Sequence, residues 1–364
     1  MARNPKLFQP ISFRGVTARN RIAVSPMCQY SAVDGLGSDW HVQHLGARAV
    51  GGAGIVFTEA THVSALGRIT PGCLGLYTPA HEAMLARLAA VIALGGAVPG
   101  LQIAHAGRKA SSTRPWEGGG PLAPAEGGWM PWAPSAIAFG EHSQVPHAMT
   151  PADIATVLAE FRATAAMARS AGFKVIEVHA AHGYLAHSFL SPLSNTRQDA
   201  YGGSLANRAR FLLETIDAVR AEWPDDLALF VRVSATDWMD GGITLGDTVA
   251  LAKLLKATGK VDLIDCSSGG ILAKGPVIAS LHPGYQVPFA EAVRREAGIA
   301  TGAVGLITCP EHAEEILGND RADLVLIGRA VLADPIWSWR AALALGAGLD
   351  IPPQYRRAGF GHGG

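Results

Sequence analysis

The sequence has few cysteines and few charged side chains, and both shortages exclude whole classes of protein. Its four cysteines, Cys28, Cys73, Cys266 and Cys309, are scattered over 364 residues and form no CxxC pair. This spacing fits neither a zinc knuckle nor a disulfide framework. Charged residues make up 16% of the chain, and 30 basic residues balance 30 acidic ones. The balance argues against nucleic acid or an anionic membrane as a partner, because both select basic surfaces.

Long apolar runs and targeting segments are also missing. No stretch approaches the roughly 20 apolar residues that a membrane span needs. The opening residues MARNPKLFQP lack the apolar core and the small-residue cleavage site of a signal peptide. Together with the scarce cysteines, these absences predict a protein of the reducing cytoplasm with no membrane partner.

What the chain does have is a rhythm of short apolar runs separated by helical segments. Near-continuous apolar runs are typical of parallel strands that are buried on both faces. Eight runs have this character: 21–27, 54–60, 98–107, 173–181, 227–235, 261–269, 299–307 and 322–330. No GxGxxG motif follows any of them, which disfavours a doubly wound nucleotide-binding sheet. The pattern therefore predicts the α/β class, a (β/α)8 TIM barrel in one domain over residues 1–364.

Helix signals support this alternation. The segment 151–172 begins after Thr150, a plausible N-cap, with Pro151 at the first helical position, and it closes on Gly172. A second amphipathic segment spans 204–223.

Two segments fall outside the rhythm. Residues 7–20 alternate apolar and polar side chains around Gly15, which predicts an N-terminal β-hairpin that closes the bottom of the barrel. Residues 108–150 are rich in Gly, Pro and Trp, and a connection of this length inside a compact domain is usually functional. Because it follows the third strand, we expect this excursion to form a hairpin lid over the catalytic face; the alternative is an ornate surface loop.

Polar residues collect at the predicted strand ends, where the βα loops of a barrel form its active site. In chain order, these residues and the small residues beside them are Cys28, Tyr30, Glu59, Ala60, Gln102, His105, His179, His182, Tyr184, Arg232, Ser267, Ser268, Gly269, Gly305, Gly328 and Arg329. The glycines of the last two loops would let the backbone approach a phosphate, which Arg329 could chelate. The alternative is a plain turn at Gly328 and a surface ion pair from Arg329.

The segment VHAAHGYLAHSFLSPLSNTRQDAYGGSLANRARF, from Val178 onward, resembles the long signature of the Old Yellow Enzyme family of FMN-dependent ene reductases. Further segments agree with the same family in the same order: VSPMCQYSA (24–32), LQIAHAGRKAS (101–111), GGPLAPA (119–125), FVRVSATDW (230–238) and GRAVLADP (328–335). Cys28 and the His–x–x–His pair resemble the bacterial YqjM-like subgroup.

The resemblance implies a barrel with tightly but non-covalently bound FMN, and NADPH or NADH as reductant. It implies a ping-pong reduction of the C=C bond of α,β-unsaturated carbonyl compounds, with hydride passing from flavin N5 to the β-carbon. The implied catalytic residues are Tyr184, which protonates the α-carbon, the carbonyl-binding His179 and His182, and Cys28, which tunes the flavin. Tyr30 and Arg357 join them as substrate-binding residues. The implied cofactor-binding residues are Ser25, Pro26, Met27, Cys28, Ala60, Gln102, His179, Arg232, Ser268, Gly305, Gly328 and Arg329.

The three histidines at 179, 182 and 187 allow other interpretations. A zinc site would want an acid between two histidines on a helix, as in HExxH, but HAAHG has none and ends an apolar strand. Core histidines without partners would be costly to bury. Two neutral imidazoles that each donate one N–H to a carbonyl oxygen fit best, so we predict no metal. His187 is assigned a structural role, and for Tyr184 and Cys28 the alternative is simple packing.

The tail at 350–364 bears on assembly. Its QYRRAGF segment resembles a family segment that carries an arginine into a neighbouring subunit's site, although Ala358 and Phe360 depart from that pattern. A homodimer or homotetramer follows if Arg357 makes this contact; a solvated basic tail is the alternative.

Two other functions compete with an ene reductase acting on enones, nitro compounds or quinones. One is a flavin-free barrel enzyme that uses histidine acid–base catalysis on a phosphorylated substrate. The other is a flavin-binding or ligand-binding module without catalytic activity.

Overall fold

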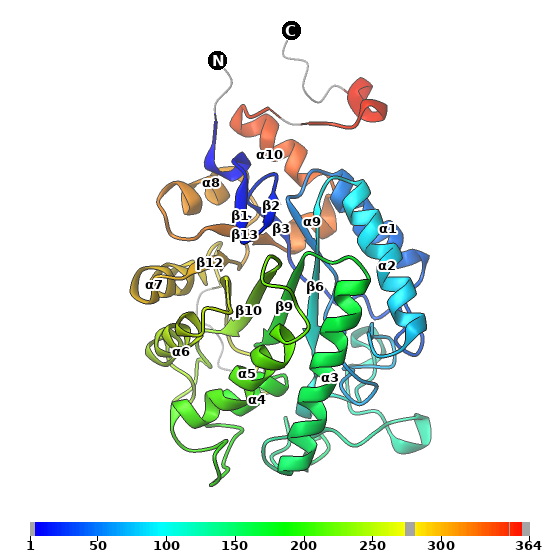
Figure 1. The fold of residues 1–364 in the computed structure, drawn as a ribbon, viewed down its shortest axis with the longest axis vertical. Coiled ribbons are helices and arrows are strands. Elements are labelled where there is room, and N and C mark those ends of the chain that lie inside the picture. Colours follow the sequence, from blue (N-terminus) through cyan, green and yellow to red (C-terminus); the bar gives the residue numbers. More distant parts are fainter. Residues whose placement is uncertain (1–3, 274–280, 349, 359–364) are drawn as a thin grey trace.

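The computed structural model describes residues 4–273, 281–348 and 350–358. Eight parallel strands form a closed ring, and helices cover its outside (Figure 1). In ring order the strands are β4 (Ile55–Phe57), β3 (Ile22–Val24), β13 (Leu324–Ile327), β12 (Ala300–Ala303), β11 (Leu263–Ser267), β10 (Ala228–Ser234), β9 (Val175–Ala180) and β6 (Val98–Ala104), which pairs back with β4. Each predicted run contains one of these strands, so the TIM barrel is confirmed.

The helices follow the strands in the expected alternation. They are α1 (Asp39–Val50), α2 (Pro79–Leu94), α3 (Pro151–Ser170), α4 (Leu185–Leu190), α5 (Leu205–Arg220), α6 (Leu245–Ala257), α7 (Val287–Ala297), α8 (Pro310–Gly318), α9 (Arg329–Ala333) and α10 (Trp337–Leu345). The start of α3 is as predicted: the Thr150 hydroxyl accepts a hydrogen bond from the Asp153 N–H at 3.2 Å. Such a cap stabilises a helix by about 1 kcal/mol. Within the described part of the chain, no helix is both long and apolar enough to cross a membrane.

The N-terminal hairpin closes one end of the barrel, as predicted. Strands β1 (Ile11–Phe13) and β2 (Val16–Ala18) pair antiparallel, and Figure 1 shows them at the end opposite α4. The ring of Phe13 meets that of Phe230 on β10 edge to face, with the centroids 4.8 Å apart. Such a pair adds about 0.5–1.5 kcal/mol beyond its burial. The hairpin therefore seals an apolar lower layer of the barrel interior.

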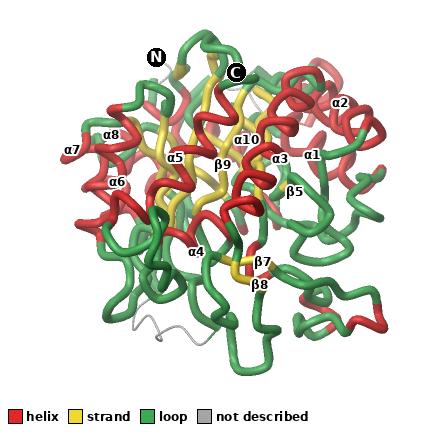
Figure 2. Tube along the Cα trace, turned by 60° about the horizontal axis from the view of Figure 1, so that its bottom comes forward, coloured by secondary structure: helices red, strands yellow, loops and turns green. Residues whose placement is uncertain are grey.

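The long excursion 108–150 lies at the other end of the barrel, but it is not a hairpin. Its strands β7 (Trp132–Ala133) and β8 (His147–Ala148) pair parallel, and Figure 2 shows them beside α4. Much of the rest is built from short 3-10 turns, two of which end at the left-handed glycines Gly118 and Gly127. The segment has no alternating apolar run, so nothing in it favours long antiparallel strands.

Candidate active site

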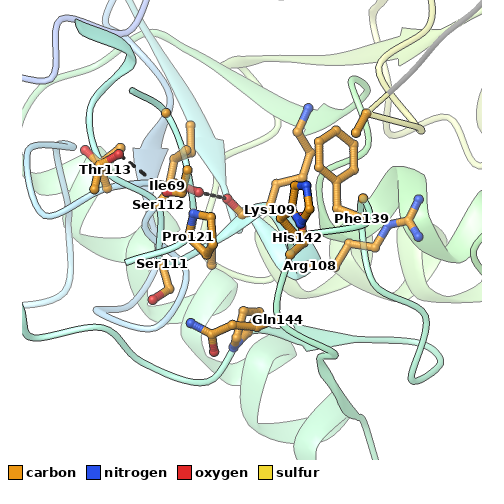
Figure 3. Close-up of a pocket in the computed structure, with 18 of the residues that line it drawn as sticks. Ile69, Arg108, Lys109, Ser111, Ser112, Thr113, Pro121, Phe139, His142 and Gln144 are labelled. Atoms are coloured by element: carbon orange, nitrogen blue, oxygen red, sulfur yellow. Dashed lines mark hydrogen bonds between the residues drawn. The ribbon is translucent and has the colours of Figure 1, made fainter. Parts of the chain in front are cut away.

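Three adjoining cavities open where the strands end. The inner cavity, of about 330 Å³, is lined by Ser25, Pro26, Met27, Cys28, Gln102, His179, His182, Tyr184, Arg232, Gly328, Arg329 and Leu332. The rim cavity, of about 180 Å³, shares Arg232, Gly328 and Arg329 with it and adds the loop that contains Gly305. The outer cavity, of about 790 Å³, is lined mostly by the excursion, and Figure 3 shows part of this lining, such as Lys109 and Phe139. Its lining also includes Tyr30 and Tyr184. Residues from widely separated strands thus meet at one face of the barrel.

Most of the catalytic, substrate-binding and cofactor-binding residues that the resemblance implies line these cavities, and three do not. The N–H of Ala60 bonds the Cys28 thiol, so Ala60 supports the site from behind. The Ser268 hydroxyl donates to Gln286 Oε1 at 2.6 Å, beside the rim cavity. Arg357 lies exposed in the 3-10 segment η5 (Pro353–Ala358) and lines none of the three cavities of its own chain. Phe360, the other tail residue compared with the family, lies outside the described residues.

The paired histidines follow β9 directly. Their ring centroids are 5.2 Å apart, and the ring planes are nearly perpendicular. His179 Nδ1 accepts the N–H of Ala181 at 3.2 Å, so its proton resides on Nε2. Burial, and next the Arg232 guanidinium, hold the pKa of both imidazoles well below the usual histidine value. Both rings are therefore neutral at physiological pH and act as hydrogen-bond donors through one N–H each.

Tyr184 stands beside this pair as a protonated phenol. Its ring meets that of His179 edge to face, with the centroids 4.8 Å apart. Burial raises the pKa of Tyr184 well above its usual value, and nearby Cys28 and Tyr30 raise it further. The Lys109 ammonium lies 5.1 Å from the Tyr184 ring centroid and 4.5 Å from that of Phe139. In Figure 3, Lys109 and Phe139 lie together at one side of the outer cavity.

The backbone of His182 has an uncommon conformation that its neighbours maintain. Its φ of 58° is left-handed, which L-residues seldom adopt. The His182 N–H donates to Ser234 Oγ at 2.9 Å, and its carbonyl accepts from Lys109 Nζ at 2.8 Å. At the next residue, a Cβ on Gly183 would lie 2.2 Å from the Gly270 carbonyl oxygen, so only glycine fits. Strain fixed by so many contacts is typical of a functional position.

His187, the third histidine, belongs to the scaffold. Its Nδ1 accepts the N–H of Gly183 at 2.8 Å, and its Nε2 lies 2.9 Å from Asp237 Oδ1. Burial acts to raise the pKa of Asp237, but the contacts with His187 and Ser191 leave it lowered. The buried pair anchors the turn that leads to α4.

Sequence reasoning missed how Glu59 acts. It meets His41 of α1 at 3.1 Å, and both side chains are buried. Its carboxylate also accepts the backbone N–H groups of Gln29 and Tyr30. Glu59 therefore shapes the loop that presents Cys28 and Tyr30 to the cavities. His41 and Glu59 are 18 residues apart in the sequence. The position of Glu59 at a strand end therefore indicated a polar residue there, but not its partner.

A buried polar layer lies between the apolar floor and the inner cavity. The Gln102 amide donates to Glu177 Oε1 at 2.8 Å, and Arg232 Nε lies 2.9 Å from Asp265 Oδ2. Glu177 and Asp265 are both fully buried, and Arg232, which pairs with Asp265, also acts electrostatically on Glu177. Like charges so enclosed cannot both ionise readily, and burial followed by Asp265 raises the pKa of Glu177 to about 8. Glu177 therefore retains a proton at neutral pH.

Glu177→Gln should flatten the pH dependence of folding stability. Because the folded-state pKa of Glu177 is raised, wild-type stability is full below the unfolded-state pKa and falls as pH rises toward about 8. One retained proton corresponds to a slope of up to about 1.4 kcal/mol per pH unit. Urea unfolding at pH 5, 6.5 and 8 measures it, with Glu296→Gln on the exposed face of α7 as control. Equal slopes in wild type and Glu177→Gln would contradict a protonated Glu177.

The inner and rim cavities fit a flavin mononucleotide better than a metal ion. Arg329 makes no ion pair with any described residue, so its guanidinium is available to a phosphate. A Cβ on Gly328 would meet only Met27 Sδ, at 3.6 Å, so the backbone there faces open space. Gly305 has a φ of 120°, a backbone conformation that residues with a side chain rarely adopt. Among described residues, no group of three or more His, Cys, Asp or Glu is arranged to hold a metal ion.

Comparisons with known proteins identify the family of the chain. Residues 6–346 match the model of the NADH:flavin oxidoreductase / NADH oxidase family. An NADPH dehydrogenase of Geobacillus sp. (strain WCH70) is 50% identical over 353 residues, which cover 96% of this chain and 98% of that protein. The solved structure of morphinone reductase is 26% identical, with a TM-score of 0.78 over 97% of this chain and 93% of that one.

A third comparison extends over only part of a longer chain. The complex of 2-naphthoyl-CoA reductase with 2-naphthoyl-CoA has a TM-score of 0.83 and 28% identity over 94% of this chain, which spans 52% of that one. The family match covers residues 6–346, and the Geobacillus relative is 50% identical over nearly the full length, which is more similarity than a shared fold alone requires. The chain therefore belongs to the NADH:flavin oxidoreductase / NADH oxidase family, that of Old Yellow Enzyme, and is an oxidoreductase of this flavoprotein type.

Proposed function

We propose that the protein is an FMN-dependent NAD(P)H:acceptor oxidoreductase that reduces the C=C bond of α,β-unsaturated carbonyl compounds. The observation that carries this proposal is the juxtaposition of two neutral imidazoles and a protonated tyrosine at one cavity. This set can polarise an oxygen and then supply a proton, which is what addition of hydride to a conjugated alkene requires.

Bound FMN would supply the redox chemistry, taking a hydride from the nicotinamide and passing one to the β-carbon of the acceptor. Arg232 and Gln102 would hold the ring in the inner cavity, with Ser25, Pro26, Met27 and Cys28 along one wall and Ala60 behind them. Ser268, Gly305, Gly328 and Arg329 would hold the phosphate end in the rim cavity. Burial raises the pKa of the Cys28 thiol well above its usual value, so an uncharged, polarisable sulfur would tune the cofactor.

His179 and His182 would bind the carbonyl oxygen of the acceptor and stabilise the negative charge that develops on it. Tyr184 would deliver its phenolic proton to the α-carbon. The relatives named NADPH dehydrogenase favour NADPH as reductant. The outer cavity would accommodate the rest of an enone, nitro compound or quinone, with Tyr30 among its contacts.

We further propose that Arg357 completes the site of a neighbouring subunit in a homodimer or homotetramer. Arg357 is exposed and lies away from the cavities of its own chain. Nearby, Tyr355 packs on Trp339 of α10, with the ring centroids 5.6 Å apart, which ties this segment to the barrel.

His179→Ala should lower kcat/KM for cyclohexenone by about 10²–10³-fold, the usual cost of removing one preorganised donor. Phenolic ligands should also bind more weakly, while flavin content stays unchanged because Arg232, Gln102 and the rim cavity remain. Steady-state kinetics and flavin absorbance measure both effects, with the exposed His282→Ala as control. Unchanged kinetics, or loss of flavin, would contradict the assigned role.

The whole proposal is tested by anaerobic titration of the purified protein. NADPH should bleach the flavin absorbance, and cyclohexenone should restore it. A protein without flavin, with a pH–rate profile set by histidine on a phosphorylated substrate, would support the rival barrel enzyme instead. Tight FMN binding without turnover would support a flavin-binding module.

A further inference from the structure

The ring of His182 contacts a serine, Ser267, that has no role in the reaction proposed above. His182 Nε2 lies 2.6 Å from Ser267 Oγ, at the end of β11. Ser267 stands beside Ser234 in the register of β10 and β11, and Ser234 accepts the backbone N–H of His182. One serine of the pair therefore holds the backbone of His182, and the other holds its ring.

The hydrogen of the Ser267 hydroxyl has two acceptors within reach. One is His182 Nε2, at 2.6 Å, and the other is Gln286 Oε1, at 3.4 Å. Ser268 already donates to the same Gln286 oxygen at 2.6 Å. The much shorter contact directs the Ser267 hydrogen to His182, because 3.4 Å is at the long limit for an O–H···O bond.

The orientation of Gln286 is fixed independently. Its Nε2 donates to the Val304 carbonyl at 3.3 Å, and a carbonyl can only accept. A flipped amide would bring two oxygens together there, and it would turn two amide hydrogens toward Ser267 and Ser268. Gln286 Oε1 therefore faces both serines.

We propose that Ser267 is a positioning residue that selects the His182 tautomer with its proton on Nδ1. A neutral imidazole carries one hydrogen, so an Nε2 that accepts from Ser267 leaves Nδ1 as the donor. His179, whose Nδ1 accepts from Ala181, carries its hydrogen on Nε2. The two histidines thus use opposite tautomers, and each keeps one N–H that donates to no group among the described residues.

The selection matters because the other tautomer would reverse the interaction. A His182 that donated from Nε2 to Ser267 would present the Nδ1 lone pair where a donor is needed. A carbonyl oxygen gaining negative charge would be repelled by that lone pair. This consequence rests on the function proposed above, whereas the tautomer itself does not.

The direct test is ¹⁵N NMR of the flavin-loaded, full-length protein labelled at the histidine ring nitrogens. His182 is assigned by comparison with His182→Asn. We expect Nε2 of His182 to have the shift of a lone-pair nitrogen and Nδ1 that of a protonated one, with His179 showing the opposite pattern. A wild-type His182 with its proton on Nε2 overturns the proposal, whatever the activity of the protein.

Substitutions at Ser267 extend the test to ligand binding. Ser267→Ala should shift His182 toward the Nε2–H tautomer and weaken binding of 4-nitrophenol by about 10–100-fold, as expected for loss of a hydrogen bond to a charged group. Ser267→Thr keeps the hydroxyl and should restore both the spectrum and the affinity. Flavin absorbance of each variant separates this outcome from failure of the proposed function. An alanine variant with the wild-type tautomer and affinity would refute the role of Ser267.

Discussion

Tyr184→Phe should slow reoxidation of the reduced enzyme by an alkene about 10²–10⁴-fold, the usual contribution of a positioned general acid. The variant keeps the ring that packs against His179 at 4.8 Å, and it removes only the O–H. Burial raises the pKa of Tyr184, so the wild-type phenol remains protonated through the neutral range. Reduction by NADPH requires no proton from this residue and should be unchanged.

Stopped-flow measurement of flavin absorbance follows reduction by NADPH and reoxidation by the alkene separately. Tyr201→Phe is a matched control, because the Tyr201 hydroxyl bonds Glu214 at 2.8 Å and lines none of the three cavities. That variant should leave both half-reactions unchanged. If Tyr184→Phe slowed both half-reactions equally, the residue would be shaping the cavity rather than donating a proton.

Arg232→Met should destabilise the fold by about 3–5 kcal/mol, the usual cost of breaking a buried ion pair from one side. Arg232 and Asp265 are register neighbours on β10 and β11, and their side chains meet at 2.9 Å inside the barrel. Without the guanidinium, Asp265 has no other ion pair among the residues that the structure describes. Flavin content should also fall, because Arg232 lines both the inner and the rim cavity.

The double variant Arg232→Met/Asp265→Asn distinguishes these two effects. Removing both charges should recover most of the lost stability, because the Asp265 carboxylate is removed together with its partner and Glu177 retains its proton. Flavin affinity should stay low, because the cation that faces the cavities is still absent. Urea unfolding and flavin absorbance measure the two quantities. Recovery of both together would mean that Arg232 supports the fold alone.

Local patterns in the sequence were enough to predict the barrel. Parallel strands buried on both faces leave unbroken apolar runs, and each of the eight runs contains a strand. Thr150 and Pro151 marked the start of α3 because capping is a local interaction. The excursion was harder, since long-range bonds determine its shape: Arg108 donates to the carbonyls of Ile137 and Ala138. Such contacts cannot be predicted from the periodicity of apolar residues in the sequence.

Some residues of the candidate site could likewise be predicted from the sequence, and others could not. Motif resemblance identified His179, His182 and Tyr184, and the structure brings them together at one cavity. Ser267 and Lys109 support His182 from β11 and from the loop after β6, and neither role can be inferred from spacing. Glu177 is a further case, because a carboxylate inside an apolar run gives no sign of its partners on neighbouring strands.

The outer cavity has a consequence for how new substrate ranges could arise. Among the described residues that line it, only Tyr184 also lines the inner cavity. Most of its wall comes from the excursion 108–150, whose described strands are only two residues long and which lies outside the barrel ring. Except at Lys109, which donates to the His182 carbonyl, mutations there can reshape the space around an acceptor while the groups that bind its oxygen keep their contacts. Natural or laboratory evolution can therefore change substrate selectivity through the excursion while the catalytic residues at the strand ends stay the same.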